Sequence, residues 1–249
     1  MNTNIYIIIF FLIQICLGQT TNPVFDIQDD IEATKIINSY IQAIGGEKKI
    51  KRINTLQKKV KIEIQNSNSV QMNTTILYKK PNLYSHTLSV GELGNVQSTK
   101  YDGVNCILNR NYNNNHISEK IEGKLLEEKK EEFYPFPIIQ LKNSNKLFKL
   151  IEVEKKSNDN ICIIKLIDFN DLETNLFFNE TNKLLSMKQT IHNNVVKTIK
   201  YRDYEEFEGI RFPFKELHTM TINEKIVQES INQINKIVIN EEIMIDEFQ

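Results

Sequence analysis

The residues best suited to chemistry in this chain are its histidines and its clustered carboxylates. The histidines are isolated along the sequence, at His86, His116, His192 and His218. None of them has a second histidine or a cysteine at the spacing that a helix or a hairpin uses for metal ligands. The acidic runs do not follow the spacing of a calcium loop with its required glycine. Each histidine is therefore interpreted as an ordinary strand or surface residue, and the sequence predicts no metal and no cofactor.

Motifs for covalent catalysis and phosphate binding are absent from the sequence. It contains no G-x-S-x-G elbow, no H-E-x-x-H pair and no glycine-rich phosphate loop. The prediction is that the protein is not an enzyme. Because catalytic triads assemble from residues far apart in a chain, a hydrolase remains an alternative. A cleft that holds a histidine beside a serine or an aspartate would favour it.

Two cysteines, Cys106 and Cys162, lie outside the N-terminal segment. In an oxidising compartment they could pair as a disulfide. The favoured interpretation is that they remain free, buried thiols that pack as small apolar side chains, because nothing in the sequence places them together. They are too few and too far apart for a structural zinc site.

The N-terminal segment predicts export. Ile5–Leu17 is one apolar run, long enough for a secretory signal and too short to span a bilayer comfortably. We expect a cleaved signal peptide over residues 1–18 and one domain over 19–249, periplasmic or secreted; an uncleaved membrane anchor is the alternative. Because the bulky Ile15 precedes Cys16, a lipid anchor is not expected.

The charge of the chain argues against one class of partner. Its formal net charge is −1. Phosphate backbones are bound by strongly basic faces, so nucleic acid is not expected as a partner.

Two periodicities predict the elements. Ile37, Ile41 and Ile44 recur at helical spacing, with Ile36 and Tyr40 beside them, and Gly45–Gly46 follows as a helix end. From about residue 59 onward, apolar and polar residues alternate, which is typical of antiparallel strands with one buried face. A polar loop over 109–115 and a charged helix over 118–132 interrupt the strands. A meander of about eleven to twelve strands of this kind curls into a barrel or a partial barrel.

Several segments, in order, resemble a family of secreted and periplasmic proteins from Bacteroidetes-like bacteria, which is similar in fold to the Lol-type lipoprotein carriers. They are Ala33–Ile53, Tyr78–Asn82, Tyr101–Gly103, Tyr201–Pro213 and Ile243–Phe248. The resemblance implies a mainly β fold, with a single antiparallel sheet curled into an incomplete barrel. It implies that the N-terminal helix and one inserted helix cover an apolar concave face. It further implies binding of acyl chains or another hydrophobic ligand without catalysis.

Strand alternation predicts which side chains line the concave face. The candidates are Val60, Ile62, Ile64, Met72, Ile76, Ile163, Phe177, Leu185 and Met187. Their register is the uncertain step, because a shift of one residue turns every side chain to the other face. The apolar loop that holds Phe133, Tyr134 and Phe136 is interpreted as a lid or cavity entrance, or alternatively as a loop packed against the barrel rim.

The function predicted from these features is a non-enzymatic envelope protein that binds a lipid, an acyl chain or a lipoprotein. The alternative is an interaction module that docks another envelope protein without a small-molecule ligand, which an uncovered strand edge would favour. A concave face filled by the protein's own side chains, with no cavity of ligand size, would count against the binder.

Overall fold

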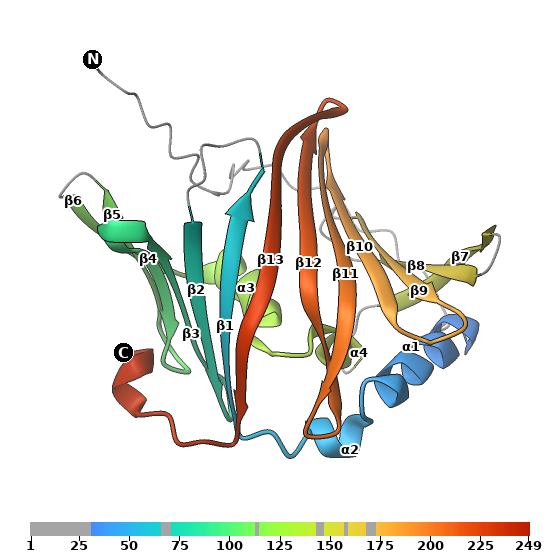
Figure 1. Ribbon diagram of the computed structural model, residues 1–249, viewed down its shortest axis with the longest axis horizontal. Helices are drawn as coiled ribbons and strands as arrows, with labels where there is room; N and C mark the ends of the chain where they lie inside the picture. The colour runs from blue at the N-terminus through green and yellow to red at the C-terminus, as the bar shows by residue number, and fades with distance from the viewer. Residues whose placement is uncertain (1–30, 66–70, 113–114, 143–146, 157–158, 168–172) are drawn as a thin grey trace.

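The computed structural model describes residues 31–65, 71–112, 115–142, 147–156, 159–167 and 173–249. The predicted signal peptide lies outside these residues. Within them the chain forms one thirteen-stranded antiparallel sheet, four α-helices and two short 3-10 helices. The strands follow the order β6-β5-β4-β3-β2-β1-β13-β12-β11-β10-β9-β8-β7 (Figure 1). Consecutive strands therefore pair with each other, except β6 and β7, which lie at the two edges of the sheet, and β1 pairs with β13.

The elements have the following bounds. The helices are α1 (Ile31–Ala43), α2 (Glu47–Ile50), α3 (Gly123–Phe133) and α4 (Pro137–Lys142), with η1 (Gly91–Leu93) and η2 (Ile245–Phe248) as 3-10 turns. The first six strands are β1 (Thr55–Ile64), β2 (Gln71–Lys79), β3 (Leu83–Val90), β4 (Gly94–Tyr101), β5 (Cys106–Tyr112) and β6 (Asn115–Ile121). The other seven are β7 (Leu147–Lys156), β8 (Asp159–Ile167), β9 (Glu173–Asn179), β10 (Leu185–His192), β11 (Val195–Phe207), β12 (Ile210–Ile222) and β13 (Lys225–Ile239).

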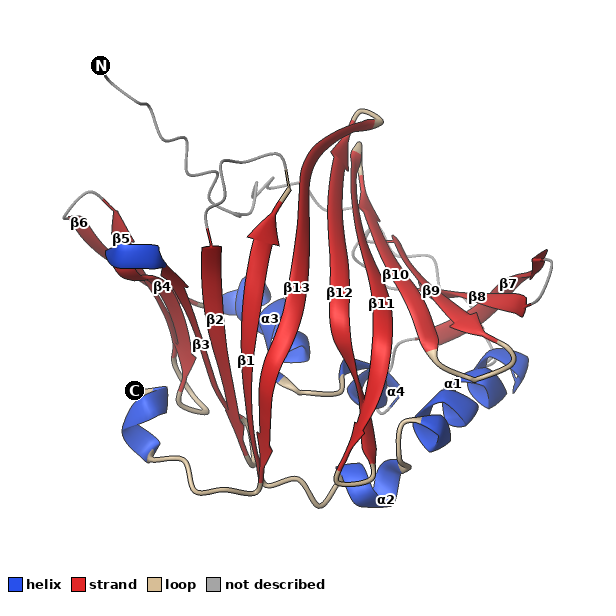
Figure 2. Cartoon of the chain, viewed as in Figure 1, coloured by secondary structure: helices blue, strands red, loops and turns tan. Residues whose placement is uncertain are grey.

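The sheet is an open half-barrel, which confirms the predicted fold class with one or two strands more than expected. Within the described residues the edge strands β6 and β7 do not pair with each other. Helices α3 and α4 lie behind the central strands in Figure 2, and α1 lies at the lower right, below β9 and β10. Aromatic rings make contacts between this helical cover and the sheet. The ring centroids of Tyr40 on α1 and Phe178 on β9 are 5.4 Å apart, and those of Phe136, just before α4, and Phe212 on β12 are 5.5 Å apart. We call this helix-covered side of the sheet the inner face.

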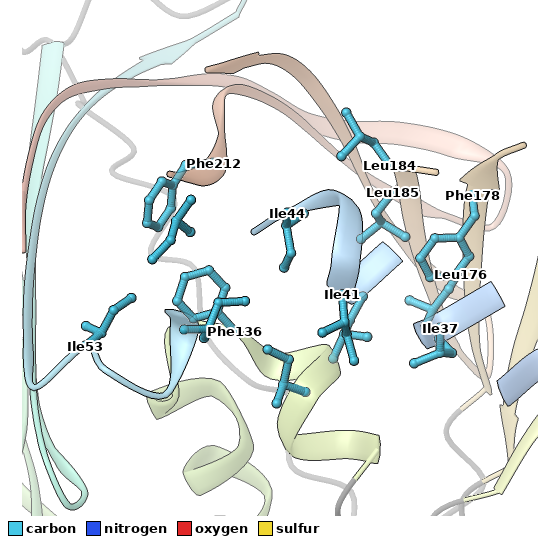
Figure 3. Packing of buried hydrophobic residues seen from close by; sticks show 14 of the residues in the cluster. Ile37, Ile41, Ile44, Ile53, Phe136, Leu176, Phe178, Leu184, Leu185 and Phe212 are labelled. Atoms are coloured by element: carbon cyan, nitrogen blue, oxygen red, sulfur yellow. The ribbon is translucent and has the colours of Figure 1, made fainter. Parts of the chain in front are cut away.

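Helix α1 packs on the inner face by the apolar stripe that the sequence predicts. Ile37, Ile41 and Ile44 are almost fully buried, and Tyr40 packs against the same cluster. In Figure 3, Ile37 lies beside Leu176 and Phe178, and Ile41 and Ile44 lie between these residues and Phe136, all in one cluster. Burial of each such side chain stabilises the fold by about 1.5–3 kcal/mol before entropy costs, so the stripe fixes α1 in place.

Gly45 allows the end of α1 to approach the β11–β12 turn closely. Its φ is +126°, and a Cβ built there would lie 2.6 Å from the carbonyl oxygen of Gly209. The Arg211 amide donates a 2.9 Å hydrogen bond to the Ile44 carbonyl across this contact. Both backbone conformation and space therefore require glycine at this position.

Gly45→Ala is expected to lower the free energy of unfolding by about 2 kcal/mol or more, because the new methyl meets backbone that has to shift. Urea unfolding followed by circular dichroism measures the change. Gly91→Ala is the control, since Gly91 also has a positive φ but no atom within 4 Å of the built Cβ. Equal losses in the two variants would show that space at Gly45 does not matter.

The inserted segment differs from its prediction. Residues 109–115 were expected as a loop and 118–132 as a helix, but β5 and β6 form a hairpin through most of this region, α3 begins only at Gly123, and a second helix, α4, follows. Arg110 and Glu119 face each other across the hairpin in a 3.0 Å ion pair. An edge hairpin with solvent on several sides carries polar residues in both registers, so its alternation is lost in the sequence.

The two cysteines are free and buried, which corrects the disulfide considered from the sequence. Cys106 lies on β5 and Cys162 on β8, near opposite ends of the sheet and in separate apolar clusters. Burial raises the pKa of both thiols. They pack as small apolar side chains, as the favoured interpretation predicts.

Candidate functional site

Two separate apolar clusters lie on the inner face. The larger joins α1 and the segment around α4 to strands on both sides of β1. The smaller joins Phe133 at the end of α3 to Tyr101, Cys106, Leu108 and Ile121 on β4, β5 and β6. Strands β2 and β3 run between the two clusters. Tyr78 of β2 belongs to the larger cluster and Tyr84 of β3 packs against the smaller one, but other inner-facing residues of these strands belong to neither cluster and form a boundary between them.

We call this boundary, with its neighbours on β1, the inner seam. Strand pairing defines it, because directly opposed residues of antiparallel strands share a face. Ile62 lies opposite Met72, and Ile76 lies opposite both Lys58 and His86. The seam consists of Lys58, Ile62, Met72, Ile76, His86 and Leu88. All six side chains are only half-buried, and among them only Ile62 packs against a core cluster.

The predicted concave-face residues of the first half all share the inner face. Val60 belongs to the larger cluster and is 8% exposed. Ile62 and Ile64 follow it at two-residue spacing on β1. On β2, Met72 lies opposite Ile62, and Ile76 lies opposite Lys58 on the same face. The four predicted residues other than Val60 remain half-buried, so the seam presents apolar surface that the fold does not fully cover.

In the second half the predicted register is wrong for three of four residues. Ile163, Phe177 and Met187 lie opposite one another on β8, β9 and β10. The neighbours of Phe177 along the chain, Leu176 and Phe178, belong to the inner cluster, so all three predicted side chains point to the outer face. Leu185 does belong to the inner cluster. An irregularity between Leu185 and Met187 shifts the register there, which simple alternation cannot anticipate.

The aromatic loop between α3 and α4 is packed into the inner face. Phe133 stacks on Tyr84 at 4.5 Å and lies 5.1 Å from Tyr101, both in or beside the smaller cluster. On the other side of the seam, Phe136 meets Phe212 in the larger cluster (Figure 3). The loop therefore bridges both clusters, as the packed-loop alternative expected, with its rings inside rather than at an exposed tip.

Two hollows occur among the described residues. One, of about 240 Å³, lies at the lower end of the seam between Tyr78, Tyr101, Phe133 and Tyr134. This is below the about 300–1,000 Å³ of ordinary small-molecule pockets. A wider one, of about 820 Å³, is a shallow depression along the outward side of α1, lined largely by polar residues. The wider hollow lies away from the seam and has little enclosure, so the smaller one is the more relevant.

The middle of the seam carries groups that can be positively charged. Lys58 and His86 flank Ile76. The positive charge of Lys129 on α3 lowers the pKa of His86. Burial is the main influence on both sheet residues: it lowers the pKa of Lys58 and lowers the pKa of His86 to about 4. The Lys58 side chain is half-buried, with its stem between apolar neighbours.

The depressed pKa of His86 predicts acid sensitivity. The unfolded chain takes up a proton near the ordinary value of 6.5 and the folded chain only near about 4, so stability is complete above 6.5 and falls as pH drops toward 4. Between about pH 7.5 and about pH 4.5 the His86 contribution to this loss is expected to be about 2 kcal/mol. Lys58 and Lys129 add to the effect, and Glu132 opposes it.

Urea unfolding at the two pH values measures this loss. His86→Gln should reduce it, whereas His116→Gln, on exposed β6, should leave it unchanged. An unaltered loss in the His86 variant would contradict the assignment.

A second polar group lies on the inner face of β12 and β13. Nε2 of His218 lies 2.8 Å from Oε2 of Glu216 and 3.1 Å from Nδ2 of Asn232. In the described part of the chain no hydrogen bond joins a histidine to a serine or an aspartate side chain, although His218 lies opposite Ser230 in the strand pairing. His86 and His218 lie on different parts of the inner face and do not pair.

Lys58 is not among the residues predicted for the site, and His86 is interpreted from the sequence only as an ordinary strand or surface residue. The signal was present, because Lys58 precedes Val60 by two residues and His86 precedes Leu88 by two. A charged or titratable residue in phase with an apolar strand face points toward the core. Only the confirmed fold shows which phase faces inward.

No helix among the described residues is long and apolar enough to cross a membrane. No family model and no curated protein sequence matches the chain. Solved structures do resemble it. A LolA superfamily protein from Nitrosomonas europaea aligns with a TM-score of 0.60 at 10% identity, over 87% of this chain and 97% of its own.

A second structure is a putative outer membrane lipoprotein-sorting protein domain from Vibrio parahaemolyticus. It aligns with a TM-score of 0.59 at 8% identity, over 87% of this chain and 96% of its own. At such low identity the likeness shows the fold alone. This chain thus has the fold of LolA superfamily lipoprotein-sorting domains.

Proposed function

We propose that this protein is a non-enzymatic binder of a hydrophobic ligand, such as an acyl chain of a lipid or lipoprotein, along the inner seam. The observation that carries the proposal is the run of half-exposed apolar side chains that continues the packed core across β1, β2 and β3. Ile62, Met72 and Leu88 are its main members. An apolar surface that a fold leaves uncovered between two clusters favours an apolar partner.

Ligand binding along the inner seam requires a helix that covers the inner face to move away from the sheet. The larger cluster fills the inner face beneath α1 and α4 with the protein's own side chains, and the hollow of about 240 Å³ is too small for a whole lipid. In this structure the inner face is therefore closed. Helix α3 contributes few apolar residues, chiefly Leu125, Leu126 and Phe133, so displacing it costs less than displacing α1.

The likeness to a lipoprotein-sorting domain supports this class of ligand. The export expected from residues 1–18 supports action in the cell envelope or outside the cell. The closer kinship with secreted and periplasmic proteins of Bacteroidetes-like bacteria rests on sequence motifs and is part of this proposal.

Calorimetric titration of the protein with decanol tests the function. A saturable, one-to-one interaction in the micromolar range is expected, because ten buried carbons yield several kcal/mol after association costs. Met72→Lys should weaken binding by placing a charge in the seam. Met187→Lys is the matched control on the outer face and should not weaken it. Absence of saturable binding, or equal weakening by both variants, would refute the proposal.

One observation favours the alternative, a protein-docking module. Edge strand β6 pairs only with β5, and every residue from Asn115 to Lys120 is exposed. An open strand edge of this kind can accept a strand from a partner. Ile117, which is 47% exposed, is the residue to change. Docking would be favoured over ligand carriage by two results together. The parent protein would not bind decanol, and the Ile117→Lys variant would lose binding of an envelope protein that the parent protein binds.

A further inference from the structure

Lys58 is the least expected residue of the seam. It lies on β1 in phase with Leu56 and Val60, both of which belong to the larger core cluster. Its cross-strand neighbours on the inner face are Ile76 and Ile237. A lysine is placed here among apolar side chains, at a position where alternation would favour an apolar residue.

The Lys58 ammonium has no partner in the described part of the chain. Neither an ion pair nor a hydrogen bond of this group is found, although the charge of Glu216 acts on it from β12. A charge that is partly withdrawn from water and left without an ionic partner is unfavourable. Burial accordingly lowers the Lys58 pKa. The closed state carries a cost that an incoming anion would remove.

The surroundings favour a single negative charge. Positive charge comes from Lys58 and from Lys129, whose side chain is 20% exposed and faces the sheet. His86 can donate a hydrogen bond without adding charge at neutral pH, since its pKa is about 4. Glu216 lies on one side, and Glu132 on α3 is 72% exposed and 3.6 Å from Lys129. These two carboxylates offset part of the positive charge of Lys58 and Lys129, so the charge balance favours about one additional negative charge rather than several.

The chemistry of the seam is therefore divided along its length. The part near the end of β1, with Met72, Leu88 and Ile62, is apolar, whereas the middle holds the half-buried cation of Lys58 and the neutral donor His86. A molecule that satisfies both parts has an anionic end joined to an apolar chain.

We infer that the ligand is an acidic amphiphile whose singly charged headgroup pairs with Lys58 while its apolar chain lies along Met72, Leu88 and Ile62. This inference rests on the proposed function and names the ligand class for that site. Lys129 and His86 complete the headgroup contacts from α3 and β3. Because Lys129 belongs to α3, the headgroup also links the bound ligand to the cover.

The experiment compares decanoate, decanol and acetate by calorimetry at about pH 7.5, where a carboxylic acid is ionised. Decanoate should bind about tenfold more tightly than decanol, as a charge-assisted hydrogen bond provides about this factor. Acetate should not bind in the same range, because a headgroup without its chain lacks the apolar contacts.

Three variants assign the preference to Lys58. Lys58→Met should bind decanoate and decanol within about twofold of each other, and its unfolding midpoint without ligand should rise, since an unpaired, half-buried charge is removed. Lys58→Arg retains the charge and should keep most of the preference. Lys59→Met changes the exposed neighbour on the other side of the strand and should keep all of it.

The outcomes separate the two claims. Equal affinity of the parent protein for decanoate and decanol would overturn the acidic-ligand inference and leave the hydrophobic binder standing. Binding of neither compound would overturn the proposed function itself. A preference that survives in Lys58→Met, or that is lost in Lys59→Met, would show that another charge recognises the headgroup.

Discussion

Phe178→Ala is expected to lower the free energy of unfolding by about 4 kcal/mol. Phe178 on β9 is 1% exposed and lies edge-on to Tyr40 of α1 at 5.4 Å, so its ring joins the helix to the sheet. Its removal leaves a cavity lined by Leu176, Leu185 and Tyr40, which a helix held along its whole length cannot collapse to fill. Chemical unfolding followed by circular dichroism measures the loss.

The adjacent residue provides the control. Phe177 is the same residue type on the same strand, but its side chain is half-buried on the outer face opposite Ile163 and Met187. Phe177→Ala should cost less than half as much. A larger loss at Phe177 than at Phe178 would mean that the inner and outer faces of the second half are assigned the wrong way round.

Phe136→Ala is expected to act in opposite directions on stability and on binding. The ring is 7% exposed and lies 5.5 Å from Phe212, so its loss should cost about 3 kcal/mol of unfolding free energy. If a ligand must displace the loop to reach the inner face, part of that displacement cost is already removed in the variant. Decanol affinity should then rise at least tenfold, since each 1.4 kcal/mol corresponds to a factor of ten. Paired measurements of unfolding and calorimetric binding test both signs.

Phe248→Ala is the matched control for this variant. Phe248 is 1% exposed, but it belongs to a third cluster with Leu77 and Leu83, away from the seam. Its loss should destabilise the protein to a similar degree without tightening decanol binding. Tighter binding in both variants would indicate that general loosening, and not release of the aromatic loop, governs access.

The first half of the inner face could be predicted from the sequence because its strands have one solvent-exposed face and one buried face. Val60, Ile62 and Ile64 alternate with polar residues, and no irregularity separates β1 from β2 in their pairing. The same rule fails at β5 and β6, where both faces of an edge hairpin meet water. The sequence therefore predicts a loop at Arg110 and a helix at Glu119, although the two residues form an ion pair between β5 and β6.

The second half could not be predicted because its strands are apolar on both faces. Ile163 and Ile164 are adjacent on β8 and both buried, so hydrophobicity alone does not distinguish inner from outer. The choice is made by α1, which packs on the face that carries Ile164, Leu176 and Phe178. A long-range contact of this kind leaves no local pattern. The same holds for the packed aromatic loop, whose partners Tyr84 and Phe212 lie on β3 and β12.

Photo-crosslinking with a diazirine-bearing decanol, followed by peptide mapping, tests the central claim most directly. Because the probe is neutral, its labelling does not depend on Lys58. The account predicts saturable labelling of β2 and β3 around Met72, Ile76 and Leu88, which unmodified decanol competes away. Labelling confined to the outer face around Phe177 and Met187, or labelling that decanol does not reduce, would contradict a ligand site on the inner seam.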